Sequence, residues 1–600
     1  MAESKNVWKR EEVKEEDRWA IEDLYPCREA WEKDAEILRH KIDKLEQYQG
    51  TLGESSRVLS GMLEEYSSTS QLFERLYVYA NQRLHENTAD STSQKLTGEA
   101  QVLMTLLNSK TAYIVPEILN IPQEKLNIFI EEDEGLKPFR IFLTQIIRQK
   151  EHTLTKEMEE LMAKIDELAQ GPGNIFSMFN NADITFPPIT NEEGNEVPLT
   201  HGRYAGYLES SSRQVRRDAF MSLYHTYRQF ENTLAATFDS NVRHAVFEAR
   251  ERKYGSSLEA ALDGSKIPTE VYDNLIQTVH GHMDLMYRYL KLRKRALGVE
   301  ELHMYDVYVS LVDDVDMKIP FDKAKEIVLD GLAPLGEEYA GRLREGFENR
   351  WIDVYENQGK RTGAYSWGAY GVHPYVLLNY QENLNQVFTL AHEMGHALHS
   401  SYSDEKQPYL YAGYKIFVAE VASTCNEALL IHHLLEQTSD KKEKAYLINY
   451  FLNQFKGTLY RQTMFAEFEK KAHKEVENGG TLNAAWLNET YYNLNREYFG
   501  DGVVLDEEIA LEWARIPHFY TPFYVYQYAT GFSAAIAISS KILKKEPGIV
   551  EKYKEFLSGG SSMDCIDLLK LCGVDMTKPE PVKDALKVFR EYLEELEQLL

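Results

Sequence analysis

The pentad HEMGH at residues 392–396 is the feature that most restricts how this chain can fold. On an α-helix, its two histidines lie four positions apart and project from one face, about one turn from each other. That spacing lets two ring nitrogens reach one Zn²⁺, while Glu393 beside the first histidine can take a proton from a water molecule. Residues 387–399 contain no proline, so they predict one uninterrupted helix. Such a helix supplies two ligands, and the fold has to bring a third from elsewhere.

The candidates for the third ligand lie in a mostly apolar segment at residues 417–430, which also reads as a helix. Glu420 and Glu427 are seven positions apart, so they share one helical face. A glutamate among Phe, Val and Ala side chains is costly to bury unless a cation compensates its charge, and Zn²⁺ would do so. We therefore predict Glu420 as the third ligand and Glu427 as a residue that orients a ligand. The competing interpretation places both glutamates on a solvated stripe.

His399 is the rival third ligand, because it lies seven positions after His392, on nearly the same stripe. However, three side chains along one straight helix span about 10 Å, too far for all of them to reach one tetrahedral ion. We therefore expect His399 to pack in the interior or to support a ligand.

Residues 515–531 combine one histidine with four tyrosines. A hydrolase that attacks a carbonyl must stabilise an oxyanion, and phenol and imidazole groups suit that purpose because they are uncharged or weakly acidic near neutral pH. Tyr524, Tyr526 and Tyr528 alternate as in a strand. Tyr520, Tyr524 and Tyr528 would instead share one helical face, and the sequence alone does not decide. The chain contains 38 tyrosines, so packing is the competing role for each of them.

A segment rich in glycine and aromatic residues, 363–374, runs into the extended residues 375–380. Glycine lets another backbone approach closely, so a strand here could pair with the main chain of a bound peptide. The alternative is an ordinary loop followed by a buried strand. On the first interpretation, Gly363, Ala364 and Tyr365 are predicted to bind substrate.

Helical periodicity dominates the rest of the chain, in segments such as 31–48, 70–86, 91–113 and 156–169. Residues 170–173, Gln-Gly-Pro-Gly, predict that the preceding helix stops there. Two short extended segments around an acidic turn at 184–199 predict an edge β-hairpin. Helical pattern resumes at about residue 212 and continues to about 254. The sequence therefore predicts a mainly α fold with a few short strands, around 184–199 and 363–380. A boundary near residue 200 would separate an N-terminal helical domain, 1–200, from a catalytic domain, 201–600.

Length and composition restrict the class of protein. The chain has 600 residues, of which 43% are apolar, enough for a large buried core. It has no run of about 18 apolar residues and no basic-then-apolar start, so we predict a cytoplasmic protein that neither spans nor binds a membrane. Its four cysteines are widely spread, which is typical of reduced thiols rather than a disulfide framework. A formal net charge of −28 argues against nucleic acid as a partner.

The motifs at residues 389–400, 417–420 and 518–531 together resemble those of the oligoendopeptidase F family, which belongs with the thimet-oligopeptidase-like zinc metallopeptidases. The resemblance covers most of the chain and is strongest from about residue 200 onward. It implies a largely α-helical fold whose two halves flank a deep channel that admits short unstructured peptides. It also implies one Zn²⁺ per chain, held by His392, His396 and Glu420, with Glu393 as the general base.

The same resemblance places the residues that bind substrate and stabilise the oxyanion within 518–528. We favour His518 and Tyr528 as catalytic residues, followed by Tyr526, with Tyr524 as a substrate contact. The predicted function is a zinc-dependent endopeptidase that hydrolyses internal bonds of short oligopeptides. The alternatives are an aminopeptidase or a carboxydipeptidase with a related zinc site, each needing a free peptide end, and a non-catalytic peptide-binding scaffold.

Overall fold

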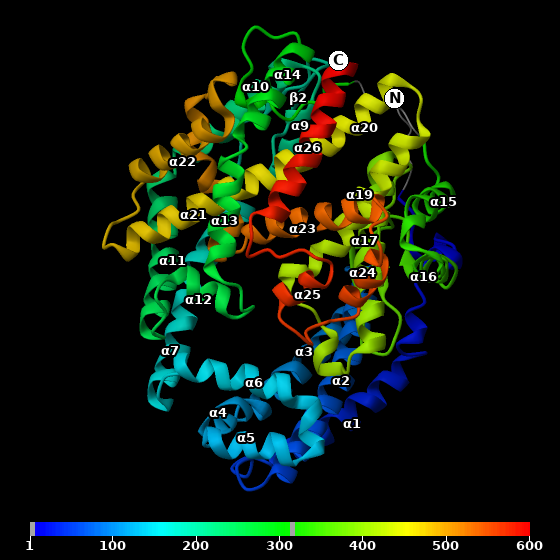
Figure 1. The fold of residues 1–600 in the computed structure, drawn as a ribbon, viewed down its shortest axis with the longest axis vertical. Coiled ribbons are helices and arrows are strands. Elements are labelled where there is room, and N and C mark those ends of the chain that lie inside the picture. Colours follow the sequence, from blue (N-terminus) through cyan, green and yellow to red (C-terminus); the bar gives the residue numbers. More distant parts are fainter. Residues whose placement is uncertain (1–6, 313–317) are drawn as a thin grey trace. The chain divides into compact units, whose positions relative to one another are not determined.

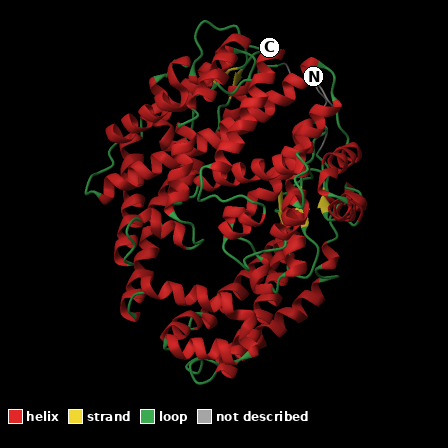
Figure 2. Ribbon diagram, viewed as in Figure 1, coloured by secondary structure: helices red, strands yellow, loops and turns green. Residues whose placement is uncertain are grey.

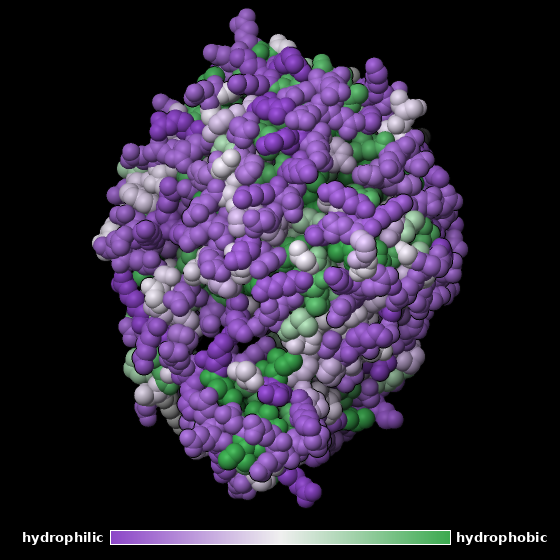
Figure 3. Space-filling model, viewed as in Figure 1, coloured by the Kyte–Doolittle hydropathy of each residue, from purple (hydrophilic) through white to green (hydrophobic). Residues whose placement is uncertain are grey.

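The computed structural model describes residues 7–312 and 318–600, and helices make up most of them (Figure 1, Figure 2). The strands of the described residues form two small sheets, so the predicted mainly α fold is confirmed. Hydrophilic side chains cover most of the face seen in Figure 3, in keeping with the net charge of −28. None of the described helices combines the length and the apolar character that crossing a bilayer requires.

The chain divides into two compact units, and each unit is built from three separate segments. Unit 1 comprises Met1–Glu151, Asp316–His433 and Ile538–Gly573, and unit 2 comprises His152–Val315, Leu434–Ala537 and Val574–Leu600. The boundary predicted near residue 200 lies within unit 2, between a short strand and a helix. The separation into domains 1–200 and 201–600 therefore stays a prediction.

Unit 1 begins with three long helices, α1 (Arg28–Glu46), α2 (Ser56–Glu86) and α3 (Ser91–Thr111), which pack on one another. They overlap the helices predicted from the apolar periodicity, and side chains cap two of them: Ser55 accepts a hydrogen bond at the start of α2, and Asp90 does so at the start of α3. Their apolar faces form one core together with α4 (Ile114–Asn120), α5 (Gln123–Glu132) and α6 (Arg140–Gln149).

The sheet of unit 1 has three short strands in the order β3-β5-β4, namely β3 (Ile352–Asp353), β5 (Tyr375–Leu377) and β4 (Tyr365–Trp367). The central strand β5 is parallel to β3 and antiparallel to β4, and it is fully buried. These strands agree with the extended segment predicted at 363–380. The remaining helices of unit 1 are α15 (Phe321–Gly331), α16 (Glu337–Glu348), α17 (Leu384–Lys406), α18 (Tyr409–Ala412), α24 (Ile549–Leu557) and α25 (Cys565–Leu571).

Two helices cross from one unit to the other along the chain: α19 (Ile416–Gln437) and α23 (Tyr526–Leu543). The helices that lie within unit 2 are α7 (Lys156–Ala169), α8 (Gly171–Met178), α9 (His201–Glu209), α10 (Arg213–Arg228), α11 (Glu231–Glu251), α12 (Ser257–Asp263), α13 (Thr269–His280), α14 (Met283–Ala296), α20 (Lys441–Gln454), α21 (Arg461–Glu477), α22 (Ala484–Phe499) and α26 (Glu580–Leu599).

Unit 2 also contains the predicted hairpin, in which β1 (Ile189–Thr190) pairs antiparallel with β2 (Glu196–Val197). The stop predicted at residues 170–173 is wrong in one respect, because α8 begins at Gly171 and carries Pro172 in its first turn. Proline is tolerated there, since the N–H that it lacks would have no partner inside the helix. The Gly-Pro-Gly run therefore starts a new helix directly after α7.

Candidate functional site

Helix α17 presents the two histidines of the pentad. Asn383 caps its first turn by accepting a hydrogen bond from the N–H of Gln386 at 3.1 Å. The helix runs without interruption through the pentad, as predicted, and most of its residues from Val387 to Leu398 are buried. The imidazoles of His392 and His396 lie side by side, with ring centroids 4.9 Å apart.

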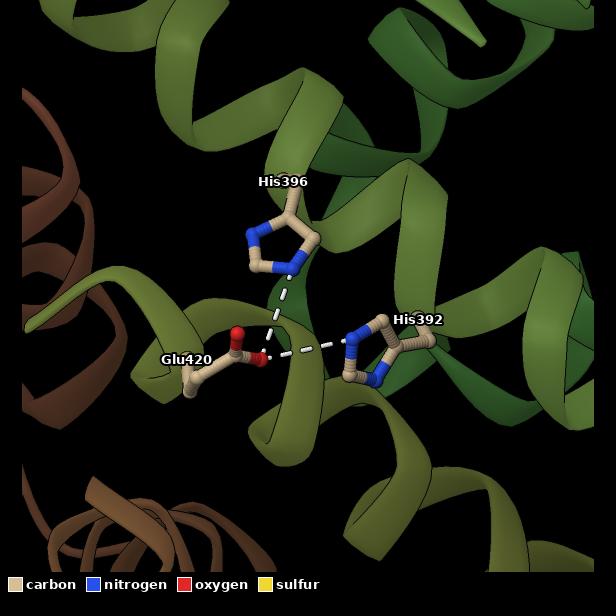
Figure 4. A group of neighbouring side chains, drawn as sticks. All are labelled: His392, His396 and Glu420. Atoms are coloured by element: carbon tan, nitrogen blue, oxygen red, sulfur yellow. Dashed lines mark ion pairs between the residues drawn. The ribbon is translucent and has the colours of Figure 1, made fainter. Parts of the chain in front are cut away.

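Three donor atoms converge on one point (Figure 4). Nε2 of His392 lies 3.3 Å, and Nε2 of His396 lies 3.5 Å, from Oε2 of Glu420 on α19. In a tetrahedral zinc site with metal–ligand distances of about 2.0–2.1 Å, neighbouring ligand atoms lie about 3.3 Å apart. The structure therefore brings the three predicted ligands together, and both distances to Glu420 match the spacing that one tetrahedral ion requires. Three such protein ligands would leave the fourth position of the ion for water.

The electrostatics of the group also suit a cation. Burial raises the pKa of Glu420, but hydrogen bonds from the two imidazoles and their charges outweigh burial, so this pKa lies well below its usual range. The carboxylate is thus held as an anion facing two imidazole nitrogens. That combination of donors is the usual set for catalytic zinc.

Glu427, which was predicted to orient a ligand, contacts the second ring nitrogen of His392. Its Oε1 accepts a hydrogen bond from Nδ1 of His392 at 2.5 Å. With a metal bound, a proton held on Nδ1 would leave the lone pair of Nε2 free to bind that metal. Glu427 is therefore in position to orient this imidazole, the role predicted for it.

Helices α17 and α19 approach each other very closely at Gly395. A Cβ atom at this position would lie 2.6 Å from Cα of Ser423 and 2.9 Å from the carbonyl oxygen of Ala422. Asn426, which is fully buried, adds a hydrogen bond from its side chain to the carbonyl oxygen of Ala391 at 3.0 Å. Neither role was predicted from the sequence, although a glycine within a helix is a signal of close packing.

Glu393, the predicted general base, is buried, with 8% of its surface exposed. Burial raises its pKa, and the neighbouring imidazoles of His392 and His396 partly oppose this effect. A carboxylate whose pKa is raised towards neutrality is a better proton acceptor at neutral pH.

His399, the rival ligand, faces another environment. It is buried, and its ring stacks on that of Tyr414 at 3.7 Å with an interplanar angle of 4°. It also contacts the ring of Phe556 at 5.5 Å. His399 therefore packs among aromatic rings, as expected.

A second group of possible ligands, His280, Glu467 and Glu497, lies in unit 2. Here Lys471 forms an ion pair with Glu467 at 3.2 Å, and Tyr498 donates a hydrogen bond to the same carboxylate at 3.0 Å. His280 contacts the same oxygen as Tyr498, Oε2 of Glu467, at 2.6 Å. Because these groups already satisfy the Glu467 carboxylate, we assign the metal to the His392 group.

The predicted oxyanion residues lie in unit 2: His518 belongs to a 3₁₀ helix (Pro517–Tyr520), and Tyr526 and Tyr528 belong to the first turn of α23. The hydroxyl of Tyr528 lies 3.5 Å from Nε2 of His518. The ring of Tyr524 stacks on His518 at 6.0 Å and meets the ring of Tyr528 edge-on at 5.5 Å. Tyr526 differs: it is 3% exposed, and its ring packs on Tyr272 at 5.1 Å. His518, Tyr524 and Tyr528 therefore form one cluster, and Tyr526 has the surroundings of a packing residue.

The segment predicted to bind substrate contains the edge strand β4. In β5, the N–H groups of Val376 and Leu378 point to the β3 side, each donating a hydrogen bond at 2.8 Å. The alternate residues Tyr375 and Leu377 therefore face β4, where they pair with Trp367 and Tyr365.

It follows that the main chain of Ser366 faces the open edge of the sheet, and by the same alternation so does that of Ala364. The side chain of Tyr365 is engaged elsewhere, since its hydroxyl lies 2.6 Å from Nδ1 of His85. Gly363 has a φ of +86°, and its carbonyl oxygen accepts a hydrogen bond from Asn379 at 2.9 Å. Of the three predicted residues, Ala364 is thus the one whose main chain is available for pairing. Ser366, which the sequence analysis missed, joins it.

Comparison with known proteins decides the family. Residues 206–588 match peptidase family M3, and residues 117–186 match the description Oligopeptidase F. The chain belongs to peptidase family M3. The resemblance found in the motifs is thereby confirmed, and this M3 chain is a metallopeptidase.

The similarity extends over nearly the whole chain. Over 591 residues the M3 chain is 50% identical to oligopeptidase PepF of Bacillus subtilis, covering 98% of this chain and 88% of the relative. It is 39% identical to group B oligopeptidase PepB of Streptococcus agalactiae, covering 98% of both. The crystal structure of oligoendopeptidase-F from Enterococcus faecium is similar with a TM-score of 0.75 at 36% identity, covering 95% of this chain and 98% of that one.

Proposed function

We propose that this M3 peptidase is a zinc-dependent oligoendopeptidase that cleaves internal bonds of short unstructured peptides and holds one zinc ion per chain. The observation that carries the proposal is the spacing of 3.3 and 3.5 Å between the two imidazole nitrogens and the carboxylate oxygen of Glu420. The names of the oligopeptidases PepF and PepB support short peptides as the substrate class. Four free cysteines in the described chain support the further proposal of a reducing, cytoplasmic location.

The residues around the metal position would have different roles in hydrolysis. When bound, zinc supplies a Lewis acid that polarises the scissile carbonyl and makes water more acidic. Glu393 takes the proton from the attacking water and delivers it to the departing amine. Glu427 accepts a 2.5 Å hydrogen bond from Nδ1 of His392 and would thereby keep Nε2 of that ring unprotonated for the metal.

We assign the remaining tasks to unit 2 and to strand β4. The Tyr528 hydroxyl and the His518 imidazole would donate hydrogen bonds to the developing oxyanion, and burial lowers the pKa of His518, which favours its neutral form. Tyr524 would contact substrate. The main-chain groups of Ala364 and Ser366 would hold an extended peptide by strand addition, which tolerates many side chains.

The decisive experiment is Glu393→Gln. This variant should keep one zinc ion per chain by elemental analysis and lose hydrolysis of a quenched fluorescent peptide by about 10²–10⁴-fold, because the proton acceptor is gone. Glu405→Gln is the matched control, since Glu405 lies exposed on the same helix and should leave turnover unchanged. Substantial turnover by Glu393→Gln would remove Glu393 from this role.

The position of cleavage separates the proposal from its alternatives. A peptide blocked at both ends, by acetylation and amidation, should still be cut at internal bonds. An aminopeptidase needs the free amine and a carboxydipeptidase needs the free carboxylate, so either enzyme would leave the doubly blocked peptide intact.

A further inference from the structure

We propose that Glu469 is a positioning residue for the reaction: its buried carboxyl group holds the turn at Phe523, from which Tyr524 and Tyr528 are presented to His518. This inference rests on the proposed function, because it matters only if that cluster acts on substrate. Glu469 lies on α21, and all of these residues belong to unit 2.

The turn at Phe523 has an unfavourable backbone conformation. Its φ is +55°, in the left-handed region that residues other than glycine seldom adopt. Such a conformation persists only where surrounding contacts hold it. The ring of Phe523 is buried against His473, at a centroid distance of 4.4 Å, and Tyr272, at 5.8 Å. These contacts anchor the side chain, and a separate contact has to anchor the main chain.

Glu469 supplies that main-chain contact. Its Oε1 accepts a hydrogen bond from the N–H of Phe523 at 3.0 Å, inside the protein. Glu469 is 0% exposed, and its other oxygen, Oε2, has no hydrogen-bond partner among the described residues. Burial raises its pKa well above the usual range, an effect that this hydrogen bond partly opposes. A buried carboxyl group with one unsatisfied oxygen is costly, so its contact with the turn is the role that explains its presence.

The position of the turn determines the geometry of the cluster. Tyr524 follows Phe523 directly, and Tyr528 lies four positions beyond Tyr524 in the first turn of α23, with their rings 5.5 Å apart. The ring of His518 lies 6.0 Å from that of Tyr524 and 5.9 Å from that of Tyr528. If the turn relaxes towards an ordinary φ, both tyrosines move relative to His518. A misplacement of about 1 Å at reacting groups costs about 10²-fold in rate.

Glu469→Leu and Glu469→Gln test the proposal together. Leucine removes the acceptor and leaves the Phe523 N–H without a partner, whereas glutamine keeps a carbonyl oxygen for it. We expect kcat to fall about 10–100-fold in the leucine variant with KM within about threefold, and glutamine to restore most of kcat. Zinc content should stay at one per chain in both variants. The same two changes at the half-buried Glu475, also on α21, are the matched controls and should leave kcat unchanged.

A second pair of variants tests the backbone directly. Phe523→Gly and Phe523→Ala both remove the ring, but only glycine adopts a positive φ without strain. We expect the glycine variant to keep a kcat several-fold higher than the alanine variant. Amide hydrogen exchange in residues 519–527 should accelerate in Glu469→Leu and not in Glu475→Leu, a readout that needs no catalysis.

The outcomes separate this inference from the proposed function. Absence of peptide hydrolysis by the wild-type enzyme would overturn the proposed function. An active wild type with equal kcat in Glu469→Leu and Glu475→Leu would overturn only the role of Glu469. A leucine variant that loses zinc, or whose loss glutamine does not restore, would also overturn it, because the effect would then not come from the hydrogen bond to Phe523.

Discussion

Replacing Gly395 by alanine should weaken zinc binding much more than it destabilises the fold. The added Cβ would lie 2.6 Å from Cα of Ser423, whereas carbon atoms in contact prefer about 3.5–4.0 Å. Helices α17 and α19 would therefore have to separate locally by about 1 Å. Such a shift would move Oε2 of Glu420 from 3.3 Å to about 4.3 Å from Nε2 of His392, beyond the spacing of a tetrahedral site.

The two free-energy effects of Gly395→Ala on folding oppose each other. Overpacking a tight interior costs about 1–3 kcal/mol, and replacing glycine by alanine within a helix gains about 0.5–1 kcal/mol. The net loss should thus be about 0–2.5 kcal/mol, visible as a decrease of a few degrees in Tm. Zinc affinity should fall about 10–100-fold, the range found when groups that hold metal ligands in place are altered.

Competition with a chromophoric chelator measures the zinc affinity, and calorimetry measures Tm. Gly341→Ala is the matched control, because Gly341 lies on helix α16 of the same unit and no atom lies within 4 Å of its ideal Cβ position. That variant should keep the zinc affinity of the wild type. If Gly395→Ala binds zinc as tightly as the control, the close approach of the two helices does not set the ligand spacing.

Two further predictions concern unit 1. Glu427→Gln should lower zinc affinity about 10-fold in the chelator assay, because it removes the charge behind His392, and an unchanged affinity would contradict the orienting role. Asp404 tests pH dependence: burial and then the negative charge of Glu74 raise its pKa to about 7. In the folded chain Asp404 therefore stays protonated to higher pH than in the unfolded chain, where its pKa is about 3.9, so its contribution to stability is lost as pH rises from about 4 to 7. Asp404→Asn should then raise Tm more at pH 8 than at pH 5, and an equal change at both values would refute the assignment.

The parts of the site that the sequence predicted are those encoded in local periodicity. The two helices that carry the predicted metal ligands are long and show consistent apolar spacing, and the seven-position separation of Glu420 and Glu427 places both on one face. Burying a glutamate costs free energy unless a cation compensates its charge, and Glu420 was predicted as the third ligand for this reason. Its Oε2 lies 3.3 Å from Nε2 of His392. Local pattern combined with metal chemistry was sufficient to predict that His392, His396 and Glu420 lie together.

The parts that the sequence did not predict depend on contacts between distant residues. Glu469 and Phe523 are 54 positions apart, and no periodicity indicates that one carboxyl group will meet that N–H. The role of Ser366 depends on which side of β5 faces β4, which is set by the pairing of β5 with β3. The start of α8 at Gly171 was missed because Gly-Pro-Gly is a frequent turn sequence, while proline is equally acceptable in a first helical turn.

Each unit is assembled from three separate segments of the chain, and this has a consequence for biosynthesis. Unit 1 needs residues up to Gly573 and unit 2 needs residues up to Leu600, so neither set of native contacts can be completed until the ribosome has made almost the entire polypeptide. The core of helices α1–α6 also includes Ala369, Tyr375 and Leu377, which are translated long after α6. Until then the nascent chain exposes the apolar surface that these residues cover, and chaperones act on such surfaces.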